Sequence, residues 1–188
     1  MVLANSEKCK LLLVGGEIGS GKSSVAKRVV DQTPGARLVR VRDVLGELLA
    51  GARGDRNWLQ TEGARLERQT RGRWLLHYLE ENCDHSVRWV VDAARTRSQV
   101  EPIIENWPGS ILVFLAASVN TRRLRFEQSR VSDPVKQSMP FELAVRHNTE
   151  AEARTISAMA HVVLDTDDMT LDEVVEVVVS HCGWAISA

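Results

Sequence analysis

The chain has 188 residues, of which 44% are hydrophobic and 26% charged, and its formal net charge is −1. This length and composition predict one globular domain over residues 1–188 with a full-sized core. The small net charge argues against broad electrostatic binding of nucleic acid, and no apolar run is long enough to span a membrane. The three cysteines are far apart in the sequence and predict reduced thiols in the cytoplasm, not a disulfide framework.

Five apolar runs predict β-strands, and helix-like stretches separate them. The runs are KLLLVG (10–15), ARLVRV (36–41), VRWVVD (87–92), SILVFLA (110–116) and AHVVLD (160–165). Alternating strands and helices predict an α/β fold with a five-stranded parallel sheet. The nearly continuous apolar runs indicate that helices cover both faces of that sheet.

Three of the expected helices begin with a capping-box pattern, in which a short polar residue is followed three positions later by Glu or Gln. The pairs are Asn57 with Gln60, Thr96 with Gln99, and Thr170 with Glu173.

The first predicted strand leads into GGEIGSGKSS (15–24), which contains the Walker A spacing G-x-x-x-x-G-K-S. Glycines allow backbone N–H groups to curl around an anion, and the helix that follows directs its N-terminal dipole at that anion. Lys22 is expected to reach the β- and γ-phosphates of ATP, and the Ser23 hydroxyl to bind Mg²⁺. The ATP-binding residues predicted by this motif are Gly16, Glu17, Ile18, Gly19, Ser20, Gly21, Lys22, Ser23 and Ser24.

Two stretches are too long to be simple crossovers between strands. Residues 42–86 have a helical pattern throughout, and the stretch from residue 130 to about 160 opens with the polar segment VSDPVKQSMP. Open α/β sheets bind ligands at the carboxyl ends of their strands, where both stretches begin. We therefore expect residues 42–86 to form a helical acceptor-binding insert, and residues 131–140 to form a lid within the same domain.

The order of these features resembles the nucleoside monophosphate kinase superfamily of P-loop proteins over nearly the whole chain. The resemblance rests on the phosphate loop, the helical insert, VVDAAR (90–95), an arginine-rich helix after the fourth strand, and AHVVLDT (160–166). Within the superfamily, RDVL (42–45) and DRNWLQTEGARL (55–66) followed by VVDAAR are most similar to the deoxynucleoside monophosphate kinase and dephospho-CoA-kinase-like branch. This similarity implies phosphoryl transfer from ATP, with Mg²⁺, to a small-molecule nucleotide.

The resemblance also implies roles for two residues after the third strand. Asp92 corresponds to the acid that orients Mg²⁺, and Arg95 to the arginine that binds the acceptor's phosphate. The branch commonly has Asp-Gly-x-Arg here, whereas this chain has Asp92-Ala93-Ala94-Arg95. An alanine in place of that glycine restricts the turn.

The remaining implied site residues lie in the two long stretches. Asp43, Arg56 and Gln60 resemble acceptor-site positions of the branch. Arg122, Arg125 and Arg130 fall at the base of the lid, where Arg122 would bind substrate and the other two would stabilise the transferred phosphoryl group. Other interpretations remain open, because Asp43 also suits a helix N-cap and arginines on a helix often form a solvated basic face.

The sequence leaves three functions open. A monophosphate acceptor attacks with an oxygen that is already anionic near neutral pH, so the leading prediction, a nucleoside or deoxynucleoside monophosphate kinase, needs no base. A kinase of a hydroxyl acceptor, such as a dephospho-CoA-like molecule or a modified nucleobase, would need one, and Asp43 is the candidate. A nucleotide-binding regulatory module is the third interpretation, and the arginines of the expected acceptor site favour an enzyme over it.

Overall fold

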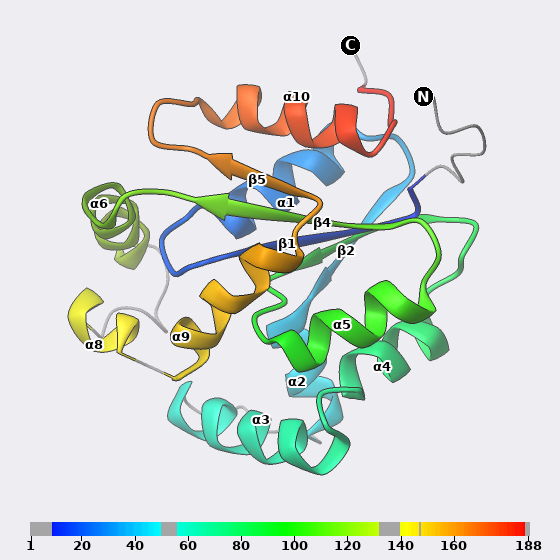
Figure 1. Ribbon diagram of the computed structural model, residues 1–188, viewed down its shortest axis with the longest axis horizontal. Coiled ribbons are helices and arrows are strands. Elements are labelled where there is room, and N and C mark those ends of the chain that lie inside the picture. Colours follow the sequence, from blue (N-terminus) through cyan, green and yellow to red (C-terminus); the bar gives the residue numbers. More distant parts are fainter. Residues whose placement is uncertain (1–8, 50–55, 132–139, 147, 187–188) are drawn as a thin grey trace.

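The computed structural model describes residues 9–49, 56–131, 140–146 and 148–186, with only the backbone for residues 56–60 and 148–151 (Figure 1). Its strands are β1 (Leu11–Gly16), β2 (Ala36–Arg40), β3 (Arg88–Asp92), β4 (Ser110–Ala116) and β5 (Val162–Asp165). Its helices are α1 (Lys22–Gln32), α2 (Val41–Leu48), α3 (Arg56–Thr70), α4 (Trp74–Asn82), α5 (Arg97–Asn106), α6 (Val119–Arg130), α8 (Phe141–Val145), α9 (Asn148–Thr155), the 3₁₀ helix η1 (Ile156–Met159) and α10 (Leu171–His181). Within these ranges, no helix is long and apolar enough to cross a bilayer.

The five strands form one parallel sheet in the order β2-β3-β1-β4-β5, which confirms the predicted fold class. The strand bounds differ from the predicted ones by up to two residues. The second strand ends one residue early because Val41 already begins α2, and the fifth begins at Val162 because Ala160 is still the cap of η1. The order places the carboxyl end of β1 between those of β3 and β4, so side chains after these strands converge there.

Helices cover both faces of the sheet, as the apolar strands predicted (Figure 1). On one face, α1 and α10 pack against Leu12 and Val14 of β1. On the other, α4 and α5 together with α2 and η1 pack against Leu11 and Leu13. All four of these β1 side chains are fully buried, so the central strand is held by two separate cores.

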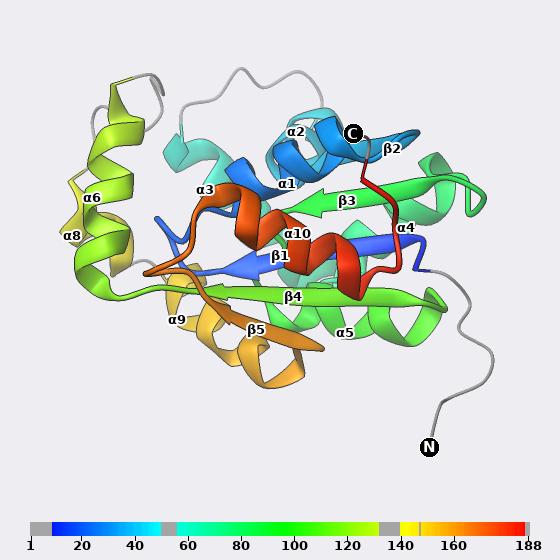
Figure 2. The ribbon, with the colours of Figure 1, turned by 90° about the horizontal axis from the view of Figure 1, so that it is seen from above.

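A smaller apolar cluster fixes α6 and α8 beside the loop that follows β1. Ile18 from the loop, Phe126 from α6 and Phe141 and Ala144 from α8 are all buried together. The rings of Phe126 and Phe141 lie 5.6 Å apart between centroids. Figure 2 shows α6 and α8 at the end of the sheet toward which the strands point.

The three predicted capping boxes have different outcomes. Thr170 and Glu173 form the complete box at the start of α10, with each side chain bound to the other's backbone N–H. At α5 only half of the box forms, because Gln99 accepts from the N–H of Arg95 instead of from Thr96. The side chains of Asn57 and Gln60 lie outside the described part of the chain.

Candidate functional site

The loop between β1 and α1 has a backbone that only glycine adopts without strain at several positions. Gly16, Gly19 and Gly21 have φ values of 143°, 79° and 94°. A Cβ on Gly19 would run into the backbone carbonyl of Arg122, so the loop lies directly against the start of α6. The loop closes on itself through a hydrogen bond of 3.1 Å from the Ser20 N–H to the Glu17 carbonyl.

Lys22 begins α1 and is buried, and its Nζ donates to the carbonyl of Glu17 at 2.6 Å. The ammonium group therefore lies across the loop. Ser23 and Ser24 follow in the first turn of α1 and are exposed to solvent. The Ser20 hydroxyl is buried and has no hydrogen-bond partner among the residues that the structure describes. The lysine and the serines of the motif thus lie in the loop or in the first turn of α1.

Asp92 ends β3, opposite Val14 of β1 and therefore next to the phosphate loop. Its side chain is 6% exposed, and its Oδ1 is buried without a hydrogen-bond partner in the described part of the chain. Such an oxygen is costly to bury unless a cation or water binds it. No group of three His, Cys, Asp or Glu side chains that could hold a metal occurs among the described residues. One carboxylate and one hydroxyl, Asp92 and Ser23, nevertheless fit Mg²⁺, which binds through few protein ligands together with substrate phosphates and water.

Ala93 adopts the left-handed backbone conformation, with φ at 72°. The resemblance placed a glycine at this position, and the structure retains the turn that a glycine would make. Its N–H donates to the carbonyl of Val14 at 3.3 Å, which holds the turn against β1. Arg95 follows two residues later, and its N–H donates to Gln99 Oε1 at 3.2 Å. Ala93 therefore occupies a backbone conformation that favours glycine, which leaves strain beside Asp92.

The helical insert is anchored to the turn that carries Arg95. Glu67 of α3 accepts hydrogen bonds from Trp74 and from the first residues of α5 and its cap. The donors are Trp74 Nε1 at 2.7 Å, Thr96 Oγ1 at 2.7 Å, Gln99 Nε2 at 2.9 Å and Ser98 Oγ. Because the other end of the Gln99 amide holds the Arg95 backbone, one carboxylate connects α3 to the predicted acceptor arginine.

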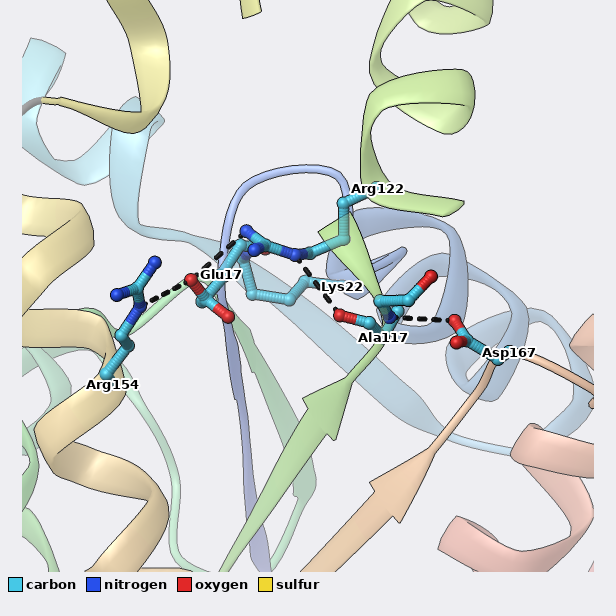
Figure 3. A network of polar contacts seen from close by, with 7 residues as sticks. Glu17, Lys22, Ala117, Arg122, Arg154 and Asp167 are labelled. Carbon is cyan, nitrogen blue, oxygen red and sulfur yellow. Dashed lines mark hydrogen bonds and ion pairs between the residues drawn. The ribbon is translucent and has the colours of Figure 1, made fainter. Parts of the chain in front are cut away.

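The three predicted arginines of α6 have different partners. Arg122 is 3% exposed, its Nε donates to the Ala117 carbonyl at 3.2 Å, and its Nη1 lies 3.1 Å from Glu17 Oε1 (Figure 3). Arg125 donates to the hydroxyl and the carbonyl of Thr166 at 2.8 and 2.7 Å, after β5. Arg130 pairs with Glu127 of its own helix at 2.7 Å. The structure therefore brings Arg122 to the phosphate loop. Arg125 instead contacts Thr166, and Arg130 pairs with Glu127.

The remaining predicted acceptor residues are only partly described. Arg56 and Gln60 lie at the start of α3, but their side chains are outside the described part, as are residues 132–139 of the expected lid. Asp43 is in the first turn of α2 with its side chain 54% exposed, 3.9 Å from each of Arg40 and Arg42.

Asp43 also lines a hollow of about 220 Å³ between β2, α2 and α4. Tyr78 and Cys83 line the same hollow. Burial and a hydrogen bond of 3.0 Å to Glu47 raise the pKa of Tyr78, and burial raises the pKa of the Cys83 thiol to about 11. Both groups are therefore neutral at physiological pH.

The sequence did not indicate the roles of two side chains near the loop. Glu17 was expected as an ATP-binding residue of the phosphate loop, yet its carboxylate pairs with Arg122 and also with Arg154 of α9, whose Nε lies 2.7 Å from Oε1 (Figure 3). Arg154 was not predicted. An acid inside a phosphate loop was the one local signal that a basic partner had to be near.

Solved structures with a similar fold include three kinases. No family model matches the sequence, and no curated protein matches it. Among solved structures, a gluconokinase from Sinorhizobium meliloti 1021 is similar with a TM-score of 0.61 and 22% identity, covering 95% of this chain and 94% of the other. A shikimate kinase from Bacteroides thetaiotaomicron has a TM-score of 0.66 at 12% identity, with 92% and 98% covered. A sugar kinase from Janibacter sp. HTCC2649 has a TM-score of 0.60 at 18% identity, with 92% and 93% covered.

Proposed function

We propose that this protein transfers the γ-phosphoryl group of ATP, with Mg²⁺, to a small-molecule acceptor. The observation that carries the proposal is the position of the phosphate loop beside Asp92, at the carboxyl ends of two neighbouring strands. The buried Oδ1 of Asp92 has no hydrogen-bond partner among the described residues. The kinase names of the structural neighbours support the same chemistry.

Phosphoryl transfer depends on positioning and on positive charge around the phosphates more than on covalent catalysis. Lys22 and the N–H groups of the loop would bind the β- and γ-phosphates, and Arg122 is the arginine of α6 that lies against the loop. Mg²⁺, held by Ser23 and Asp92, would neutralise charge that develops on the phosphate oxygens. Arg125 and Arg130 would contribute only after leaving Thr166 and Glu127.

For the acceptor, we propose a nucleoside or deoxynucleoside monophosphate whose phosphate is bound by Arg95. Arg95 follows Asp92 in the turn beside β1, and the Glu67 network ties this turn to the helical insert. A planar guanidinium can hold a phosphate through two parallel hydrogen bonds and fix it for in-line attack.

A hydroxyl acceptor is the second candidate. The gluconokinase and shikimate kinase among the structural neighbours carry names that imply such acceptors. Asp43 is a half-exposed carboxylate beside a hollow, at the carboxyl end of β2, and it would serve as the general base for an alcohol.

Transfer from radiolabelled ATP to a panel of nucleoside monophosphates, sugars and hydroxy acids tests the proposal. We expect transfer to a monophosphate, its loss in Lys22→Ala, and a large rise in the acceptor KM for Arg95→Lys, because lysine keeps the charge but loses the fork. Arg97→Lys is the matched control, since Arg97 is exposed and pairs with Glu101 at 2.7 Å.

Two results would contradict the acceptor assignment. Transfer to an alcohol that Asp43→Asn abolishes and Arg95→Lys leaves unchanged would establish the hydroxyl-acceptor alternative. ATP binding with no transfer to any acceptor would favour the regulatory module.

A further inference from the structure

The carboxylate of Glu17 joins the phosphate loop to two helices that are distant in sequence. Its Oε1 lies 3.1 Å from Nη1 of Arg122 in α6 and 2.7 Å from Nε of Arg154 in α9 (Figure 3). The carbonyl of the same residue accepts the ammonium of Lys22 at 2.6 Å. Three cationic side chains therefore meet on one residue of the loop.

Burial shows that this arrangement balances charge inside the protein. The Arg122 side chain is 3% exposed and that of Glu17 16% exposed, whereas Arg154 is 60% exposed. A guanidinium as buried as that of Arg122 requires an anion nearby, because removing it from water is costly unless it is paired. Among the described residues, Glu17 is the acid that pairs with Arg122.

We propose that Glu17 is an internal counter-anion of the donor site: its carboxylate holds Arg122 and Arg154 until a nucleotide binds, and the nucleotide's phosphates then displace it from both guanidinium groups. The inference rests on the proposed function, since it takes the loop to be the site of the donor phosphates. It assigns to Glu17 a role in setting donor affinity that the Walker A pattern, which leaves this position variable, does not contain.

Charge and geometry explain why displacement is required. Guanidinium groups attract carboxylate and phosphate oxygens alike, so Glu17 and a phosphate compete for the same two cations. Arg154 donates a hydrogen bond to Glu17, whereas Nη1 of Arg122 pairs with it by charge alone, without hydrogen-bond geometry. A carboxylate that stays beside a bound triphosphate repels it, and in a poorly hydrated site this repulsion is only weakly screened. The measured association constant is then the intrinsic constant multiplied by the fraction of molecules in which Glu17 has released its arginines.

The same exchange would couple donor binding to the helices on either side of residues 131–147. Arg122 lies near the start of α6, which precedes this stretch, and Arg154 lies in the last turn of α9, which follows it. Releasing Arg154 from Glu17 removes the ion pair that ties α9 to the loop. A nucleoside, which carries no phosphate, would leave the ion pair in place.

Isothermal titration of the full chain with ATP, ADP and adenosine, each with Mg²⁺ and with EDTA, tests this inference. Glu17→Gln keeps the size and the carbonyl bond to Lys22 but removes the charge. We expect it to bind ATP about tenfold more tightly than wild type, ADP with a smaller gain, and adenosine unchanged. Glu142→Gln is the matched control, because it removes an acid that pairs with Arg123 of the same helix α6 at 3.0 Å.

Glu17→Gln leaves a buried arginine without its carboxylate, so its melting temperature and circular dichroism are measured first. If it does not fold, Glu17→Asp replaces it: the charge remains, but the shorter side chain does not reach both arginines, and we expect a smaller gain for ATP in the same direction. The inference is overturned if a folded Glu17→Gln binds ATP no more tightly than wild type. The same result in Glu17→Asp overturns it when that variant is the one used. Wild-type protein that binds neither ATP nor ADP instead contradicts the proposed function itself.

Discussion

Replacing Ala93 by glycine should stabilise the protein. Ala93 has a φ of 72°, where the Cβ of an L-residue approaches its own backbone, and this conformation costs an ordinary residue about 1–2 kcal/mol. Glycine removes that strain but loses roughly 0.5–1 kcal/mol of backbone entropy on folding. The expected net gain is therefore about 0.5–1 kcal/mol, which for a chain of this size raises Tm by roughly 1–4 °C.

Thermal and urea unfolding of Ala93→Gly measure this gain in stability, and Ala94→Gly is the control from the same turn. Ala94 is fully buried and is not among the residues with positive φ. Replacing Ala94 by glycine removes a buried methyl group and raises the entropy of the unfolded chain. Both effects lower stability, so we expect Ala94→Gly to be destabilised by about 1–2 kcal/mol. The argument from backbone strain would be wrong if the two variants were destabilised equally.

Three further predictions concern other parts of the site. Gly19→Ala places a methyl group against the carbonyl of Arg122 at a φ of 79°, so we expect titration to show that most ATP binding is lost; wild-type affinity would refute the close approach. Glu67→Gln disturbs four hydrogen bonds and should lower the free energy of unfolding by about 2 kcal/mol. It should also raise the KM for the acceptor and leave the KM for ATP unchanged. A rise in both KM values would contradict a connection that acts through Arg95. Burial raises the pKa of Cys83 from 9.0 to about 11, so alkylation of the folded protein should be slow at pH 8 and accelerate only toward pH 11. The stability that the neutral thiol contributes below pH 9 should be lost as the pH rises from 9 to 11. An alkylation midpoint near pH 9 in the folded protein would contradict this.

The sequence could predict the parts of the fold and the site that depend on neighbouring residues. The phosphate loop is one continuous stretch whose glycines, Lys22 and Ser23 have fixed spacing. Asp92 was predictable for a similar reason, since a polar residue that ends a buried strand must emerge at the carboxyl edge of the sheet. The succession of strands and helices along the chain likewise follows from the periodicity of its apolar residues.

Side-chain partners across long separations could not be predicted in this way. Arg122 and Arg125 are three residues apart on one helix, yet one contacts Glu17 and the other Thr166, 41 residues further along the chain. The Glu17 and Arg154 pair spans 137 residues. Helical spacing fixes the direction of each side chain only approximately, and the elements packed against the helix decide which partner each one reaches.

β1 is synthesised before the strands that flank it in the sheet. β1 emerges first from the ribosome but lies at the centre of the sheet, and its neighbour β4 begins only at Ser110. The core beneath β1 closes later still, when α10 supplies four buried valines and Trp184 donates to the Cys9 carbonyl at 2.7 Å across 175 residues. In a nascent chain that has not passed residue 170, α1 is the helix that covers this face of the central strand, and the part that α10 covers stays exposed. Chaperone contact during translation should therefore persist until α10 has left the exit tunnel.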